Sequence, residues 1–369
     1  MALVPATGAA FCLPPLTTGG YRLAEAPNPA ALWLELTLRQ HELCSRSAAQ
    51  PQEVRVAVFG NSAVYGFPLA STQGFTHLLN EDFAAQGVPA HLYNLAFPGT
   101  YQLRDAVTMH AALPYRPDVL VYPVTLSDLD TVVPTLYAPV ARFFDSNFDA
   151  MAEMELEPPL GLEEPMQRYA WPVAVMQQRN HWLDRWREIG AYVRGTLKYQ
   201  ATRLAGALAP PAPWKMPPTR GRQTSYDCAA TQRDFDREFE DWQSWNILAY
   251  LEDLQANFGL RVVVVNWPVA HEPVGDCYNV RFPAAAVQEF NDWLGRETAQ
   301  RGLIYVDLHD LLPADQFFDS LHVTAAGHQM IAAALRYRLL SAVAEARTRQ
   351  DRRPEIDLTP AAAAAHSPS

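Results

Sequence analysis

Three separated residues carry side chains that together could perform acyl chemistry. Ser62 lies in Gly60-Asn61-Ser62, and Asp319 and His322 lie three positions apart near the other end of the chain. A serine hydroxyl is a poor nucleophile until an imidazole accepts its proton, and a carboxylate on the other imidazole nitrogen holds the tautomer that this requires. The Asp319-x-x-His322 spacing predicts that one short turn delivers base and carboxylate together, while Ser62 comes from a distant strand end.

Each of these residues also has a purely structural interpretation. A Gly-x-Ser sequence after a strand is commonly only a turn, and Asp319 could brace the turn before a helix that Thr324 caps. His328, one turn into that helix, is expected to be structural, and Asp128 is expected to be a cap or a hydrogen-bond partner. No metal site is predicted, because three further histidines lack ligand spacing and are expected to be solvated or capping: His110, His271 and His309.

The surrounding sequence predicts an α/β chain. Nearly continuous apolar runs predict five strands, over 54–59, 91–97, 119–124, 261–267 and 304–308. Helical periodicity predicts helices over 74–86, 103–113, 242–257, 284–300 and 324–346. This alternation is typical of a doubly wound, mostly parallel sheet with helices on both faces. In such a sheet the functional crevice lies beyond the carboxyl ends of the strands, so residues that follow the strands are the ones to inspect.

Four of these strand ends have unusual sequences: GNSAVYG at 60–66, FPGT at 97–100, TLSD at 125–128 and FDSLH at 318–322. They resemble the sequence blocks of the SGNH (GDSL-like) hydrolase superfamily, and the resemblance covers 54–128 and 261–340 in the family's order. Members share a flavodoxin-like sheet and hydrolyse or transfer acyl groups. The resemblance implies that Ser62 is the nucleophile, His322 the general base and then acid, and Asp319 the residue that orients it.

The resemblance also implies an oxyanion hole, formed by the N–H groups of Ser62 and Gly99 and by a side chain at Ser127. Two of the departures from the family pattern bear directly on the site. Asn61 stands where the family has Asp, and Asn can form similar hydrogen bonds in a turn. Ser127 stands where the family has the Asn of Gly-x-Asn-Asp, and its shorter hydroxyl would donate directly, through water, or not at all. Loss of one such donor costs on the order of 3 kcal/mol of transition-state stabilisation.

The sequence divides into a core domain with additions. Residues 1–50 are predicted to form an N-terminal arm and helix, 51–347 the SGNH-like α/β domain, and 348–369 a disordered tail. The core is interrupted at 130–241 by a predicted large helical insertion that acts as a cap. Its tryptophans, among them Trp182 and Trp186, lie near Arg179. They form either a small core that fastens the insertion or an aromatic and basic lining for sugars or anionic head groups.

The composition of the chain limits the classes of partner that it is expected to bind. The net charge of −11, from 40 acidic and 29 basic residues, argues against nucleic acid, which is bound through basic surfaces. The four cysteines, at 12, 44, 228 and 277, have no zinc-finger spacing and are expected to be buried thiols. No run approaches the roughly 20 apolar residues that span a bilayer, and the first residues make a poor signal peptide. The chain is therefore expected to be soluble, cytoplasmic by default, with its compartment and oligomeric state open.

The resemblance implies a serine-dependent acyl ester hydrolase or O-acyltransferase without a cofactor, acting on an acylated carbohydrate or another small ester. The large insertion and the altered third block resemble bacterial SGNH proteins that modify cell-surface polysaccharides, some beside a membrane acyl carrier, which would make a membrane acyl-transfer protein a partner. An alternative is a catalytically silent SGNH-fold binding or assembly module, in which Asn61 and Ser127 mark lost activity. Nucleotide binding has little support, because no G-x-G-x-x-G sequence follows the first strand. A third interpretation, a flavodoxin-like cofactor binder, predicts that the protein copurifies with coloured flavin.

Overall fold

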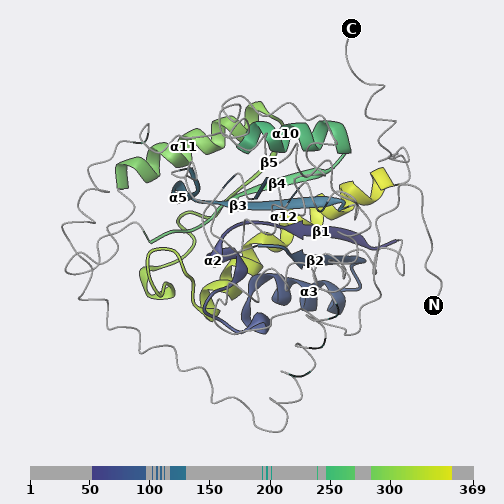
Figure 1. Cartoon of the computed structure of the whole chain (residues 1–369), viewed down its shortest axis with the longest axis horizontal. Helices are drawn as coiled ribbons and strands as arrows, with labels where there is room; N and C mark the ends of the chain where they lie inside the picture. The colour runs from purple at the N-terminus through teal and green to yellow at the C-terminus, as the bar shows by residue number, and fades with distance from the viewer. Residues whose placement is uncertain are drawn as a thin grey trace.

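The computed structural model describes residues 52–96, 117–129, 247–270 and 284–350, together with positions 102, 105, 106, 109, 112, 193, 197, 201 and 239. These residues contain a five-stranded sheet in which every paired strand is parallel to its neighbour (Figure 1). Its strands are β1 (Val54–Val58), β2 (Ala90–Asn94), β3 (Val119–Val124), β4 (Arg261–Asn266) and β5 (Ile304–Asp307). Their order, β2-β1-β3-β4-β5, is the flavodoxin-like doubly wound order, so the predicted fold class is confirmed.

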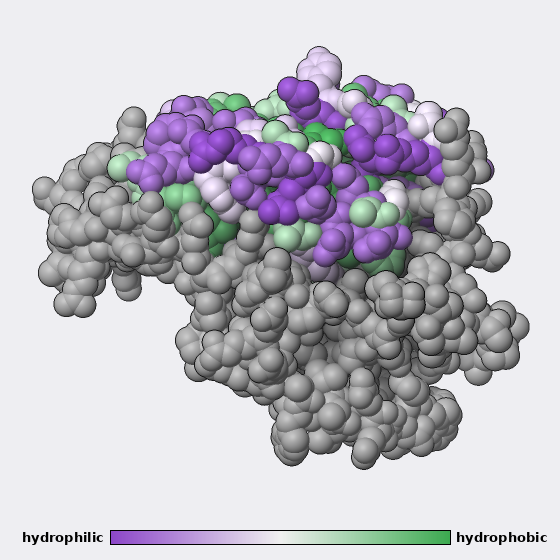
Figure 2. Space-filling model, turned by 90° about the horizontal axis from the view of Figure 1, so that it is seen from above, coloured by the Kyte–Doolittle hydropathy of each residue, from purple (hydrophilic) through white to green (hydrophobic). Residues whose placement is uncertain are grey.

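Helices cover both faces of this sheet (Figure 1). The described helices are α2 (Ser62–Tyr65), α3 (Phe75–Ala85), α5 (Leu126–Leu129), α10 (Ile247–Phe258), α11 (Ala284–Gln300) and α12 (Ala325–Gln350), with short 3-10 helices η1 (Ser71–Gln73) and η5 (Ala314–Gln316). Helices α3 and α12 pack together on one face, and α10 and α11 lie on the other. Figure 2 shows that the outward surface over α10 and α11 is mainly hydrophilic, as expected for helices that bury only one side.

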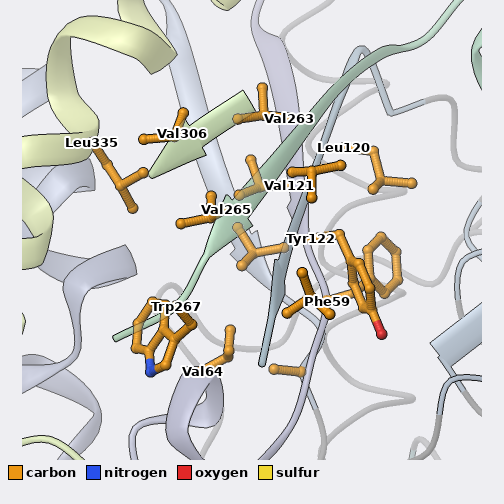
Figure 3. Close-up of a cluster of buried hydrophobic side chains, with 14 of the residues drawn as sticks. Phe59, Val64, Leu120, Val121, Tyr122, Val263, Val265, Trp267, Val306 and Leu335 are labelled. Carbon is orange, nitrogen blue, oxygen red and sulfur yellow. The ribbon is translucent and has the colours of Figure 1, made fainter. Parts of the chain in front are cut away.

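The apolar runs that predicted the strands are buried because helices cover them on both sides. All residues of β1 and β3 are buried, as are the four consecutive valines of β4. Val121 of β3 pairs with Val263 of β4, and Figure 3 shows their side chains in one core with Leu335 of α12. Burial of each such side chain stabilises the fold by about 1.5–3 kcal/mol. The strand ends that carry the candidate site are thus held by a well-packed core.

Several predicted bounds differ from the observed ones. Strand β2 ends at Asn94 rather than Phe97, because the side chain of Asn94 accepts a hydrogen bond from the Ala96 N–H (3.1 Å) and turns the chain. The final helix continues to Gln350, four residues beyond the predicted end at Ala346, so 348–350 are helical and not part of a disordered tail. Within α12 the Thr348 hydroxyl donates to the carbonyl of Glu345 (2.8 Å).

Other predictions concern segments that the structure does not describe. The N-terminal arm and helix at 1–50 and the tail at 351–369 lie outside the described residues, as do all four cysteines. Of the predicted insertion at 130–241, positions 193, 197 and 201 are helical, and the rest is not described apart from position 239. In the described part of the chain, no helix combines the length and the apolar character needed to cross a membrane.

Candidate active site

Ser62 is presented by a tight turn at the carboxyl end of β1. Gly60 has a φ of 136°, which side-chain-bearing residues rarely adopt, and a Cβ there would lie 2.9 Å from Cγ2 of Val64. Asn61 caps α2, since its Oδ1 accepts the N–H of Ala63 at 3.0 Å. Ser62 is consequently the first residue of α2, where its own N–H precedes the helical hydrogen-bond pattern and is available to a ligand.

Asp319 and His322 lie in the turn that precedes α12. Oδ1 of Asp319 accepts the N–H groups of Leu321 and His322, both at 2.8 Å, and therefore fixes the backbone of the turn. The turn is closed by the Phe318 N–H, which donates to the His322 carbonyl at 2.8 Å. The structural interpretation of Asp319 as a brace is thus correct for one carboxylate oxygen. It leaves the other oxygen, Oδ2, for the imidazole.

The structure brings Ser62, His322 and Asp319 together in one hydrogen-bonded chain. Oγ of Ser62 lies 2.8 Å from Nε2 of His322, and Nδ1 of His322 lies 2.6 Å from Oδ2 of Asp319. Because an ionised carboxylate only accepts hydrogen bonds, Nδ1 carries the proton and Nε2 is free to accept the serine proton. The His322 side chain is 17% exposed, so the imidazole is shielded while the site still opens to solvent.

The environment of Asp319 keeps it ionised. Burial favours the neutral acid, but the hydrogen bond and charge of His322 and the two backbone N–H groups outweigh it, so the pKa of Asp319 lies below its ordinary value. At neutral pH the carboxylate is therefore charged. It can stabilise the imidazolium that forms when His322 takes a proton.

A second polar contact joins the first and third sequence blocks, and sequence reasoning did not find it. Asp128, fully buried in α5 just after β3, accepts the N–H and the hydroxyl of Thr125, both at 2.8 Å. Asn61 donates its side-chain N–H₂ to both Asp128 oxygens, at 3.1 and 3.2 Å. Asn61 therefore links the α2 turn to the end of β3, and Asp128 is the hydrogen-bond partner expected for it.

Burial raises the pKa of Asp128 to about 6, and the charge of Asp105 adds to the rise, while hydrogen bonds from Thr125 and Asn61 oppose it. An uncharged amide at position 61 suits this environment better than a second carboxylate would. The side-chain N–H₂ of Asn61 supplies Asp128 with a donor that a carboxylate at this position would lack. In the sequence, the only indication of the contact between Asn61 and Asp128 is that Asp128 matches the last residue of the Gly-x-Asn-Asp block.

Only part of the predicted oxyanion hole lies in the described residues. The N–H of Ser62 lies at the start of α2, whereas Gly99 is outside the described residues. Ser127 occupies the second position of α5, directly after β3, and its side chain is not described. The contribution of Gly99 and Ser127 therefore remains a prediction.

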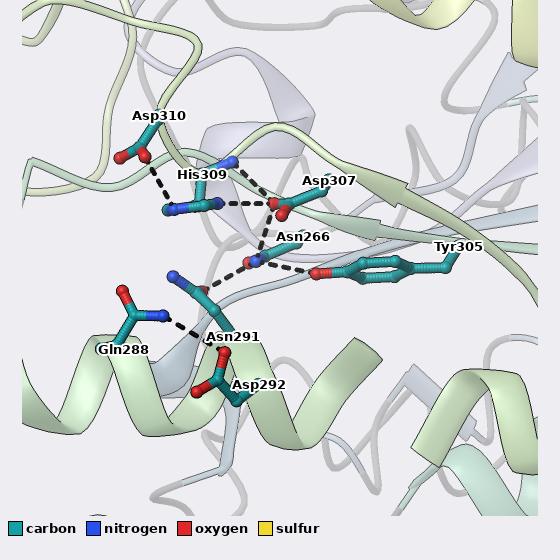
Figure 4. A network of polar contacts seen from close by, with 8 residues as sticks. All are labelled: Asn266, Gln288, Asn291, Asp292, Tyr305, Asp307, His309 and Asp310. Carbon is teal, nitrogen blue, oxygen red and sulfur yellow. Dashed lines mark hydrogen bonds and ion pairs between the residues drawn. The ribbon is translucent and has the colours of Figure 1, made fainter. Parts of the chain in front are cut away.

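The other histidines that the structure describes do not join Ser62, His322 and Asp319, and His110 and His271 lie outside the described residues. His328 is fully buried on α12, where Nδ1 accepts the N–H of Phe75 (3.4 Å) and the two rings stack, in agreement with a structural role. His309 contacts carboxylates on both sides, with Nδ1 2.7 Å from Asp307 and Nε2 2.9 Å from Asp310. Figure 4 shows this cluster beside Asn266 at the ends of β4 and β5. The described residues contain no group of side chains suited to hold a metal ion.

Comparison with known proteins gives similarity only at the level of structure. No family model and no curated protein matches the chain. Similar solved structures include the esterase EstA from Pseudoalteromonas sp. (9% identity, TM-score 0.37, 78% of this chain and 98% of that one). They also include a carbohydrate acetylesterase family member from Sinorhizobium meliloti (11%, 0.38, 79% and 99%) and the two-domain esterase CEX, active on acetylated mannans (13%, 0.37, 84% and 54%).

The strand order, and the places of the first, third and last of the four sequence blocks, agree with the flavodoxin-like, SGNH-type fold class that the sequence predicts. Ser62 follows β1, Thr125-Leu126-Ser127-Asp128 follows β3, and the turn with Asp319 and His322 follows β5.

Proposed function

We propose that the chain is a serine-dependent acyl ester hydrolase or O-acyltransferase of the SGNH type. The observation that supports this most directly is the unbroken hydrogen-bonded chain from Ser62 through His322 to Asp319. A binding module has no need for a serine hydroxyl aligned on an imidazole whose far nitrogen is held by an ionised carboxylate. That arrangement lowers the barrier to nucleophilic attack at a carbonyl carbon.

In the proposed reaction, Oγ of Ser62 attacks the ester carbonyl as Nε2 of His322 takes its proton. The carbonyl oxygen becomes an oxyanion that accepts the N–H of Ser62, with Gly99 and Ser127 proposed as further donors. Collapse of the tetrahedral intermediate breaks the ester C–O bond, and the leaving alcohol takes the proton from His322. The acyl group then remains on Ser62. Asp319 stabilises the imidazolium during both proton transfers.

A second nucleophile completes the cycle. His322 deprotonates water or a sugar hydroxyl, which attacks the acyl carbon and releases it from Ser62, and the proton returns to Oγ. Water gives a free acid, and a sugar hydroxyl gives a new ester. We propose an acylated carbohydrate as the first substrate class and a small or lipid ester as the second, on the basis of the sequence resemblance. A membrane acyl carrier is the proposed donor partner in the transfer reaction.

Turnover assays test this proposal. The purified chain is incubated with p-nitrophenyl acetate, and separately with an acetylated oligosaccharide in the presence and absence of an unacetylated acceptor. Free acetate and acetylated acceptor are both quantified, with Ser62→Ala as control. The proposal predicts acetate release or acetyl transfer that is lost in Ser62→Ala. Equal background rates in both proteins, with the fold intact, would contradict it and favour the silent binding module.

A further inference from the structure

We propose that Phe67 is a positioning residue that holds the imidazole of His322 in line with Ser62, a role that rests on the proposed function. The Phe67 and His322 rings meet edge to face, with centroids 5.2 Å apart and planes at 78°. The backbone N–H of Phe67 also donates to the carbonyl of Ser62 at 3.0 Å. One residue therefore contacts both the nucleophile's backbone and the base's side chain.

The two hydrogen bonds of His322 restrain one motion of its ring only weakly. Nε2 is held by Ser62 and Nδ1 by Asp319, so the imidazole can still tilt about the line through these two contacts. Such a tilt takes the Nε2 lone pair out of line with Oγ of Ser62 and the Nδ1–H out of line with Oδ2 of Asp319, which weakens both hydrogen bonds. A rigid aromatic ring packed at a steep angle to the imidazole blocks the tilt, and edge-to-face pairs of this kind are favourable.

Phe67 can restrain the His322 ring because its own backbone is fixed. It directly follows Gly66, the left-handed residue that ends α2, and its N–H shares the Ser62 carbonyl with the N–H of Gly66. Its side chain is half-buried and packs on the hydrophobic core. The position of the Phe67 ring is therefore fixed relative to the turn that carries Ser62. His322, which the ring contacts, comes from a segment more than two hundred residues away.

A positioning role and a simple core role predict different kinetics. If Phe67 only fills the core, then Phe67→Leu lowers the free energy of unfolding and leaves the chemistry of the folded protein unchanged. If it aligns His322, the same variant reacts more slowly at Ser62 while substrate binding stays the same. An aromatic replacement such as Phe67→Tyr should then restore the rate. Phe83→Leu is a matched control, because Phe83 is fully buried in α3 and the chemical change is identical.

The readout is the second-order rate of Ser62 modification by a fluorophosphonate, which needs no knowledge of the natural substrate, together with kcat and KM on p-nitrophenyl acetate. We expect Phe67→Leu to lower the labelling rate and kcat about tenfold, which corresponds to about 1.4 kcal/mol in the barrier. KM should stay within twofold, Phe67→Tyr should react within threefold of the wild type, and folded Phe83→Leu should react at the wild-type rate.

Two results would overturn the inference, and a third would remove its foundation. Wild-type labelling rates in folded Phe67→Leu would show that the ring does not align His322, while the proposed function stands. Equal losses in Phe67→Leu and Phe83→Leu would show a general effect of core truncation. Absence of Ser62-dependent labelling in the wild type would overturn the proposed function itself, and the positioning role with it.

Discussion

Replacing Asn61 with Asp would restore the Gly-Asp-Ser sequence of the resembling family, yet we expect it to destabilise this protein at neutral and higher pH. The side-chain nitrogen of Asn61 lies 3.1 and 3.2 Å from the oxygens of buried Asp128. Two ionised carboxylates at that distance repel each other by about 5 kcal/mol at an effective dielectric constant of 20. The folded variant avoids this repulsion by keeping one proton on the pair.

The cost of keeping that proton follows from the pKa of Asp128, which burial has already raised to about 6. Above that value, holding the proton costs about 1.4 kcal/mol per pH unit. The folded pair binds a proton that the unfolded chain releases, so stability is greatest at low pH and falls as pH rises. In the wild type the free energy of unfolding stops falling with pH once Asp128 has ionised. In Asn61→Asp the free energy of unfolding continues to fall, because the folded pair still holds its proton. The destabilisation relative to the wild type should therefore be small at pH 5 and about 3 kcal/mol at pH 8.

Urea unfolding at pH 5, 6, 7 and 8 measures this difference. Asn61→Ser is the control, because serine retains an N-cap oxygen and adds no charge. It loses the amide donor to Asp128, so its stability loss should grow with pH, but by less than that of Asn61→Asp. The double variant Asn61→Asp with Asp128→Asn exchanges the amide and the carboxylate and should remove the pH dependence. The reasoning is refuted if Asn61→Asp and Asn61→Ser lose equal stability across the whole pH range.

Two further substitutions test the parts of the candidate site. Asp319→Asn should lower the rate of Ser62 acylation by about 10³- to 10⁴-fold, because an amide no longer enforces the tautomer with the proton on Nδ1 of His322, and a labelling rate near that of the wild type would exclude this role. Gly60→Ala should destabilise the fold by about 1–3 kcal/mol in urea unfolding, since its φ of 136° strains any side-chain-bearing residue and the new Cβ would meet Val64. Unchanged stability would show that the turn before Ser62 relaxes freely.

The sequence predicted those parts of the fold that depend on local patterns. Strand β3 and helix α11 have the predicted bounds, because an uninterrupted apolar run and a regular helical period leave little choice of conformation. The convergence of Ser62 with Asp319 and His322 was also predictable, since the carboxyl ends of parallel strands meet at one edge of the sheet.

Contacts that depend on side-chain register across different strand ends were not predictable in the same way. The pairing of Asn61 with Asp128 requires β1 and β3 to be neighbours, an order that periodicity does not specify. The contact between Phe67 and His322 requires the turn after α2 to face the turn before α12. The early end of β2 accompanies a local hydrogen bond from the Ala96 N–H to the Asn94 side chain, which the apolar pattern of the strand does not reveal.

The central claim, that His322 and Asp319 activate Ser62 as a nucleophile, is tested most directly by reaction with a fluorophosphonate. Intact-mass spectrometry followed by peptide mapping identifies the modified residue. We predict one adduct per chain, located at Ser62, formed with loss of fluoride and absent from Ser62→Ala. A folded wild-type protein that forms no adduct, or an adduct that persists in Ser62→Ala, would contradict the claim.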